Sequence, residues 1–198
     1  MENGVLIIEV KGIGGTSKDN ECSQISKIKL RRSKERGNFD VYALYIVNHQ
    51  RYLPPKERQN PPFLEHQIAD ALNDERGLLT TWDLFKSYFM VNNGIIDKSF
   101  IRSRILEFGL VHFEPDHLPL LGIVDEVYRN GKVFILTLKN VTVKKGDVIV
   151  ISHDEEYFKA TVMNMQVEGV DVNEADSGEI GFEIDSAVKR KSKIYRGH

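Results

Sequence analysis

The sequence has few of the features that place a protein in a special class. Its single cysteine, Cys22, cannot form a disulfide within the chain, so no oxidising compartment is required. No apolar run approaches the roughly 20 residues that span a bilayer, and the first residues lack the basic region of a signal peptide. We therefore expect a cytoplasmic protein with no membrane partner.

An excess of charge of one sign is also lacking. The 27 lysines and arginines and the 29 aspartates and glutamates give a net charge of -2, which is not the global signature of a nucleic-acid binder. A local basic patch can still serve that purpose. With 198 residues, of which 41% are hydrophobic, the chain is long enough for one large domain or two small ones.

The first part of the chain alternates strand and helix patterns. Residues 4–11 and 40–47 are apolar, β-branched runs typical of buried strands. Between them, helical spacing over 20–36 predicts a basic amphipathic helix. A proline-rich loop at 51–62 precedes further helices and a short strand. This order predicts an α/β or α+β unit with a parallel or mixed sheet, which we bound at residues 1–114.

One later helix in this part has an apolar stripe. It is expected to begin near Thr81, and four apolar side chains recur on one of its faces, which predicts that they are buried. They are Leu84, Phe85, Tyr88 and Phe89.

The pattern changes to alternation after Pro115 and Pro119. Six strand-like segments then follow, separated by glycine-containing turns. They predict a small all-β barrel over residues 119–198, because closing such a sheet hides its edges. The segments are 122–128, 132–138, 148–152, 157–167, 180–184 and 193–195.

Two charged side chains stand at the end of the first predicted strand. Glu9 and Lys11 are two residues apart, so they project from one face of the strand, whereas Val10 projects from the other. In phosphodiester hydrolysis a carboxylate can hold Mg²⁺ and a lysine can position the attacking water. A Glu-x-Lys sequence also occurs in exposed strands that have no such function, so a structural role is the alternative.

The elements around these residues resemble the later half of the PD-(D/E)xK nuclease fold. The resemblance consists of an apolar strand ending in Glu-x-Lys, a Gly-rich turn, a basic helix with Gln24 and a second apolar strand with a polar end. It continues through NHQRYLPPKERQNPPF and LLTTWDLF and covers about residues 4–90. It implies a restriction-endonuclease-like domain in which Glu9 and Lys11 are catalytic, Glu9 binds Mg²⁺ or Mn²⁺, and Gln24 supports the site.

The motif of that family begins with an aspartate on a preceding strand, which this sequence lacks. We therefore expect the unit to be N-terminally incomplete, with three explanations: an upstream domain of a longer protein, a partner chain that completes the sheet, or loss of catalysis. An unpaired first strand also favours a homo-oligomer. Within the chain, Asp40 is expected at the opposite end of the sheet from Glu9, and Asp83 either caps a helix or replaces the missing ligand.

Four further side chains are candidates for nucleic-acid binding. Lys27 and Arg31 belong to the basic run of the predicted helix, which either contacts phosphates or is a solvated face. His49 and Arg51 follow a predicted buried strand, where α/β folds often place ligand groups. Their alternative role is to anchor the proline-rich loop. Both DNA and RNA fit this set.

The predicted barrel has a resemblance of its own. The segments GIVDEVYRNGKVFILTLKN, VKKGDVIVI and FKATVMNMQVEGVDVNEADSGEIGFEI resemble the second domain of translation elongation factor Tu, over about residues 121–195. In that family the barrel binds RNA or packs against other domains, which implies an accessory platform and no catalytic residue.

The two resemblances lead to one functional hypothesis and one alternative. The first is part of a metal-dependent nuclease or nuclease-like protein that hydrolyses or binds nucleic acid, with the barrel as a platform. The alternative is a non-catalytic module, built on a degenerate nuclease fold, that binds nucleic acid or protein.

Overall fold

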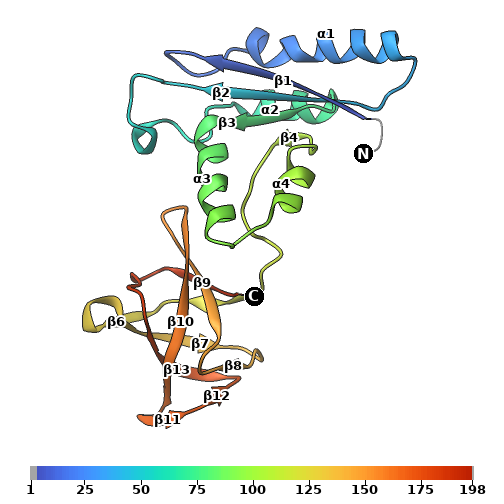
Figure 1. Cartoon of the computed structure of the whole chain (residues 1–198). Helices are drawn as coiled ribbons and strands as arrows, with labels where there is room; N and C mark the ends of the chain where they lie inside the picture. The colour runs from blue at the N-terminus through green and yellow to red at the C-terminus, as the bar shows by residue number, and fades with distance from the viewer. Residues whose placement is uncertain (1–3, 198) are drawn as a thin grey trace. The chain divides into compact units, whose positions relative to one another are not determined.

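The chain forms an α/β unit and a small all-β barrel, as the sequence predicts. A computed structural model describes residues 4–197. One compact unit extends to Phe89 and includes Asp97–Glu114, and the other comprises Met90–Ile96 with the chain from Pro115 onward (Figure 1). None of the helices in the described part combines the length and the apolar character needed to cross a bilayer.

The first unit is a four-stranded sheet with helices in its connections. The strand order is β1-β2-β3-β4, and each of the three pairs is parallel, where a parallel or mixed sheet was expected. The carboxyl ends of its strands therefore lie at one edge. The elements are β1 (Val5–Gly12), α1 (Asp19–Arg36), β2 (Val41–Asn48), the short 3-10 helix η1 (Pro55–Glu57), α2 (Glu65–Asn73), β3 (Gly77–Thr80), α3 (Thr81–Asn92), α4 (Lys98–Arg104) and β4 (Gly109–Leu110).

The main core of this unit lies on the face of the sheet that α1 and α2 cover. Alternate residues of β2 point to this face, and Ile7 of β1 packs against the same cluster. Because strand side chains alternate, Glu9 and Lys11 project to the same side as Ile7. The buried members of the cluster are Cys22, Ile25, Ala43, Tyr45, Val47, Phe63, Ala71 and Leu78.

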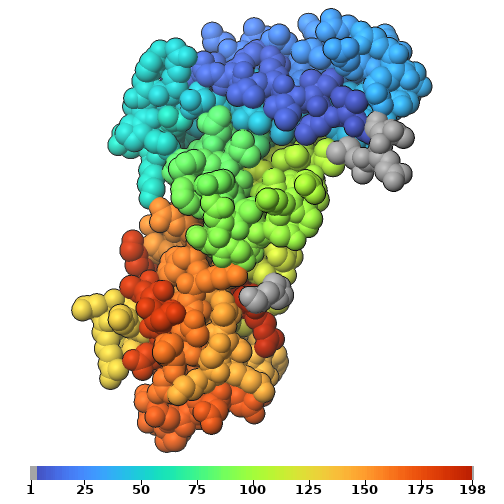
Figure 2. All heavy atoms as spheres, in the orientation of Figure 1, coloured from blue at the N-terminus to red at the C-terminus, as the bar shows by residue number. Residues whose placement is uncertain are grey.

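The other face of β1 is open. Ile8 is 51% exposed and Val10 is 63% exposed. Among the described strands, β1 pairs only with β2, so its outer edge carries unpaired backbone groups. Figure 2 shows side chains of β1, in dark blue, at the surface of the unit.

The ends of α1 are set by local signals. The backbone N–H of Lys18 donates to the side chain of Glu21 at 2.9 Å, which fixes the first turn. Gly37 ends the helix with a left-handed backbone at φ 67°. These bounds place Gln24 in the second turn of α1, beside the end of β1.

The stripe on α3 is a correction to the sequence prediction. Its four apolar side chains were expected to be buried, but they are 39 to 60% exposed. Ser87, between these positions, is buried instead. An apolar stripe shows that a helix is amphipathic, but it does not fix which face of a short helix is packed, because tertiary contacts decide this. The rings of Phe85 and Phe89 pack on each other at 4.8 Å.

The second unit is a curled antiparallel sheet around its own core. The strand order is β5-β14-β9-β10-β13-β7-β6, with β11 paired to β10 and a separate β8-β12 pair. The rings of Phe134 and Phe182 stack at 5.2 Å in its centre. The elements are β5 (Leu120–Ile123), β6 (Glu126–Tyr128), the 3-10 helix η2 (Arg129–Gly131), β7 (Val133–Leu138), β8 (Val143–Lys144), β9 (Val148–His153), β10 (Glu156–Val167), β11 (Val170–Val172), β12 (Glu174–Ala175), β13 (Gly178–Ile184) and β14 (Lys193–Arg196).

Candidate functional site

The structure brings Glu9, Lys11 and Gln24 together near the carboxyl end of β1. The ammonium Nζ of Lys11 lies 3.2 Å from Oε1 of Glu9. The same ammonium donates a hydrogen bond of 2.7 Å to Oε1 of Gln24 on α1. The strand end and the helix therefore hold one cation between a carboxylate and an amide, and these are the three residues that the sequence singles out as catalytic.

The carboxylate of Glu9 is only partly satisfied. Its side chain is 16% exposed, and Oε1 faces Lys11. The other oxygen, Oε2, is buried and accepts no hydrogen bond from any of the described residues. A buried acceptor without a partner costs about 1–3 kcal/mol of stability. An oxygen kept at such a cost is a candidate ligand for something that binds there.

Tyr45 lies beneath the site. Lys11 Nζ lies 6.0 Å from the centroid of its ring, and the Tyr45 hydroxyl lies 3.3 Å from Oγ of Ser17. Burial raises the pKa of Tyr45 to about 12, so its hydroxyl stays neutral and acts as a hydrogen-bonding group. The sequence did not single out Tyr45, because an aromatic residue inside an apolar strand has the pattern of a core residue.

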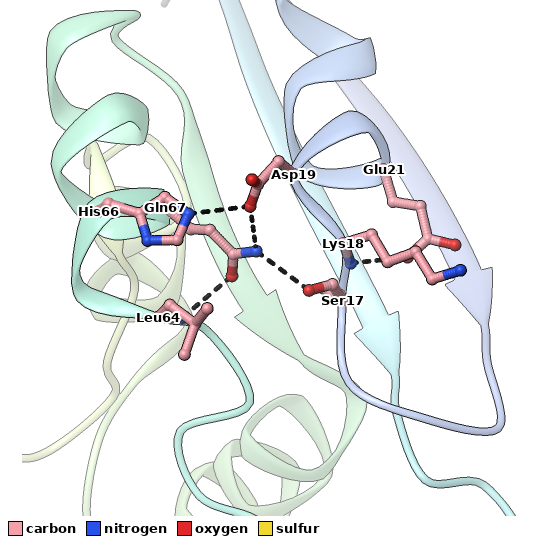
Figure 3. A network of polar contacts seen from close by, with 7 residues as sticks. All are labelled: Ser17, Lys18, Asp19, Glu21, Leu64, His66 and Gln67. Atoms are coloured by element: carbon pink, nitrogen blue, oxygen red, sulfur yellow. Dashed lines mark hydrogen bonds and ion pairs between the residues drawn. The ribbon is translucent and has the colours of Figure 1, made fainter.

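A polar network fixes the connection between β1 and α1 (Figure 3). The buried amide of Gln67 on α2 donates to the carbonyl oxygen of Ser17 at 3.0 Å and to Oδ1 of Asp19 at 2.7 Å. Nε2 of His66 lies 2.9 Å from the same oxygen of Asp19. Hydrogen bonds from Gln67 and His66 lower the pKa of Asp19. The start of α1, and with it Gln24, is thereby attached to α2.

Arg51 lies at the same edge of the sheet. Its Nη1 donates to the carbonyl oxygen of Gly12 at 3.4 Å, one residue after Lys11. Its Nη2 donates to the hydroxyl of the exposed Tyr52 at 2.7 Å. The Tyr52 ring lies so close to Gly14 that a Cβ there would be 3.3 Å from it. The β1–α1 turn and the loop after β2 thus pack on each other beside Lys11.

His49 has the anchoring role that was the alternative for it. The side chain is 3% exposed, and its Nε2 donates to the carbonyl oxygen of Gln59 at 2.8 Å. Burial lowers the pKa of His49. Arg58 also holds the loop, because its Nη1 donates to Oδ1 of Asn48 at 2.6 Å. The imidazole therefore holds the loop through Nε2, while its buried Nδ1 has no hydrogen-bond partner among the described residues.

Lys27 and Arg31 lie along one stripe of α1 with Gln24. Residues three and seven positions apart share a helix face, and both cations are exposed. Arg31 has a distant partner, since its Nε lies 4.0 Å from Oε1 of Glu35. Lys27 and Arg31 therefore lie on the same face of α1 as Gln24, at increasing distance along the helix from the Glu9–Lys11–Gln24 cluster.

The other candidate acids have local partners. Asp83 accepts a hydrogen bond from the Thr80 hydroxyl at 2.6 Å and pairs with Lys86 at 2.9 Å. Its backbone N–H donates to Oγ1 of Thr80 at 3.0 Å, so Thr80 is the residue that caps α3, and Asp83 lies in the first turn. Asp40 pairs with Arg36 at the amino end of β2, and the parallel register places it at the opposite end from Glu9, as predicted.

Glu9 is the predicted metal ligand, and its Oε2 accepts no hydrogen bond from the described residues. Within residues 4–197, no three His, Cys, Asp or Glu side chains are grouped so that they could hold a metal ion. Mg²⁺ is commonly held by one or two carboxylates together with water and substrate phosphates. The buried Oε2 of Glu9 fits one such position.

Comparisons with known proteins give only distant likenesses. No protein-family model and no curated protein sequence matches the chain. One similar solved structure is the C-terminal domain of a putative U32 peptidase from Geobacillus thermoleovorans, with 14% identity and a TM-score of 0.36 over 41% of this chain and 94% of that one.

Two other similar structures are translation factors. GDP-bound aIF5B from Aeropyrum pernix has 16% identity and a TM-score of 0.35, and elongation factor SelB from Methanococcus maripaludis has 12% identity and a TM-score of 0.31. Each match covers 96% of this chain but only 38% and 39% of theirs. We base no inference on likenesses this distant, and the candidate site rests on its own geometry.

Proposed function

We propose that the α/β unit binds the phosphodiester backbone of nucleic acid at the Glu9–Lys11–Gln24 cluster and forms part of a metal-dependent nuclease. The observation that supports this most is the buried, unpartnered Oε2 of Glu9 beside a positioned ammonium. A structural ion pair needs no such free oxygen. A site that takes up a cation and a phosphate does.

Each residue of the cluster has a distinct role in this proposal. Glu9 would hold Mg²⁺ or Mn²⁺ through Oε2. An ammonium has three donors, and Glu9 and Gln24 engage two of those on Lys11. The third is left for a phosphate oxygen or an attacking water. Gln24 fixes the direction of Lys11, and the cation when bound would polarise the phosphodiester.

The second carboxylate would come from outside the described residues. The open edge of β1 can pair with one more strand, which would lie about 4.8 Å away and place its side chains beside Glu9. An upstream segment of a longer protein or a second copy of this chain are both suitable sources.

A non-catalytic module is the second candidate. It is favoured by the lack of a three-ligand acidic group within residues 4–197. In that case Lys11, Arg51 and the α1 stripe would bind phosphates without cleaving them, and the affinity would fall steeply with salt.

The test is to incubate the chain with labelled single-stranded and double-stranded DNA and RNA, with Mg²⁺ or Mn²⁺. The variants Glu9→Gln and Lys11→Ala are expected to lower cleavage by about 100-fold or more, since each removes a group that opposes transition-state charge. Arg32→Ala removes an exposed cation of the same helix that is not on the face of Gln24, Lys27 and Arg31, so it is the matched control and should cleave normally.

Two outcomes would contradict parts of the proposal. Cleavage that survives both Glu9→Gln and Lys11→Ala would refute the site. If no substrate is cleaved, binding at low salt that is lost in Lys11→Ala but kept in Glu9→Gln would support the non-catalytic module. Failure to bind any nucleic acid at low salt would refute both candidates and leave a protein partner.

A further inference from the structure

The outer face of the barrel has a hollow that plays no part in the proposed nuclease function. Its volume is about 450 Å³, and it lies over strands β6, β7, β13 and β10. Its lining includes Tyr128, Val133, Gln166, Gly181 and Glu183. We call it the Gly181 hollow, and all of its lining residues belong to the second unit.

The hollow exists because Gly181 has no side chain. Gly181 pairs with Ile135 of β7 on one side and with Gln166 of β10 on the other, so it lies in the middle of the sheet. A Cβ at this position would meet its nearest neighbour at 3.8 Å, which is ordinary contact distance. Its φ also lies outside the left-handed region that favours glycine. Neither sterics nor backbone conformation requires glycine here, and its effect is to leave space.

The hollow is apolar on the side of β7, where Val133 lines it and Ile135 lies beside it. Val133 and Ile135 of β7 lie on the same face as Gly181, because Ile135 is its register partner and Val133 is two residues away. Tyr128 pairs with Val133 and presents a half-exposed ring. A flexible aliphatic stem can lie against such a surface, with a cation over the ring.

The rim is acidic. Glu183 and Glu179 flank Gly181 on β13, and Glu126 lies in the same cross-strand row. Asp171 on β11 pairs with Gln166, and hydrogen bonds from Gln166 and Asn164 lower its pKa, which keeps it ionised. Arg129 offsets one of these charges, since it lies 3.7 Å from Glu183. Arg129 and Glu183 both line the hollow and balance each other, so the negative charge beside it comes from Glu126, Glu179 and Asp171 at neighbouring positions of the sheet.

We propose that the Gly181 hollow binds an arginine or lysine side chain of a protein partner. The aliphatic stem would lie on Val133 and Ile135, and the charged end would reach Tyr128 and the carboxylates of Glu126 and Glu183. The charge complementarity selects this occupant, because the same rim repels the phosphates of nucleic acid. The barrel would then bind a partner protein, and the α/β unit would bind nucleic acid. Neither proposal depends on the other.

The test uses amide NMR spectra of the full chain, titrated with the tripeptide Gly-Arg-Gly. Its control is Gly-citrulline-Gly, which has the same shape and no charge. The arginine peptide is expected to shift the amides of Gly181, Gln166 and Val133, and the citrulline peptide is not. Gly181→Leu, which fills the space, and Glu183→Gln should each weaken binding by about tenfold.

The matched control variant is Glu168→Gln in the β10–β11 turn, which should bind as the unaltered chain does. If Gly181→Leu does not fold, Gly181→Ala and Glu183→Gln carry the test. Equal shifts with both peptides would overturn the proposal, and so would binding unaffected by the hollow variants. Shifts of the same amides by single-stranded oligothymidine would assign the hollow to nucleic acid instead. Cleavage by the α/β unit is unaffected by any of these outcomes.

Discussion

If Glu9 is kept for function, removing it should not weaken the fold. In Glu9→Met the unpartnered buried oxygen disappears, which should raise the free energy of unfolding by about 1–3 kcal/mol. The lost ion pair with Lys11, whose side chain is 25% exposed, costs about 0.5–1 kcal/mol. Lys11 keeps its hydrogen bond to Gln24. We expect Glu9→Met to be between unchanged and about 2 kcal/mol more stable.

Replacing Lys11 instead of Glu9 should lower the stability of the unit. Lys11→Met leaves the Glu9 carboxylate, which is 16% exposed, without its cation. Removing one partner of a buried pair costs about 3–5 kcal/mol, and the partial exposure of this pair reduces the expected loss to about 1–3 kcal/mol. The two variants should therefore differ by about 1–5 kcal/mol, although both exchange one charged side chain for methionine.

Urea unfolding followed by Trp82 fluorescence measures this difference. Trp82 is the single tryptophan of the chain and belongs to the α/β unit, so its signal follows that unit. Val10→Met, on the exposed face of β1, is the matched control and should change stability by less than about 0.5 kcal/mol. If Glu9→Met and Lys11→Met destabilise the unit equally, the carboxylate is structural and the reasoning for the site is refuted.

Three further predictions concern groups around the site and the sheet. Burial raises the pKa of Cys22 from 9.0 to about 11, so at about pH 8 its thiolate fraction should be about 100-fold lower than in the unfolded chain. Labelling of Cys22 by iodoacetamide, measured by mass spectrometry, should be slower in the folded chain by at least that factor. Equal labelling rates with and without urea would contradict this prediction. Burial lowers the pKa of His49 below its ordinary 6.5, so the unfolded state takes up the proton first as the pH falls, and the stability that His49 contributes is complete above pH 6.5 and decreases below it. In His49→Gln, the urea midpoint should fall less between neutral and acidic pH than in the unaltered chain. An unchanged pH profile would contradict the burial of a neutral His49. Gly109 has φ +76°, and a Cβ there would lie 2.8 Å from Leu72, so Gly109→Ala should lower the free energy of unfolding by about 1–3 kcal/mol, measured with urea. Gly15→Ala is the control and should lower it little, because the space around Gly15 is open. Equal effects of the two variants would show that the close approach of Leu72 does not require glycine at position 109.

Much of the α/β unit can be predicted from the sequence because its signals are local. Apolar runs and helical spacing predict β1, α1 and β2 to within a residue or two. Alternation alone places Glu9 and Lys11 on one face. The contact with Gln24 was suggested by the family resemblance, and the structure supplies it at 2.7 Å.

The remainder depends on contacts between distant segments. The network through Ser17, Tyr45 and Gln67 joins residues that are 28 and 50 positions apart, so no local pattern announces it. The burial of His49 follows from the loop that folds back to offer the carbonyl of Gln59. Two-residue strands such as β4 exist only because a partner strand lies beside them. Each of these features is decided by tertiary packing.

The long strand β10 joins the two halves of the barrel sheet, which are β5, β14 and β9 on one side of it and β13, β7 and β6 on the other. Its residues 156–161 pair with β9, and its residues 162–166 pair with β13, so a single continuous segment belongs to both halves. Neither half can detach while the other keeps its full set of backbone hydrogen bonds. A protease cut in the middle of β10 should therefore unfold the whole barrel rather than release a folded half, and the barrel's resistance to proteolysis should be lost in a single step.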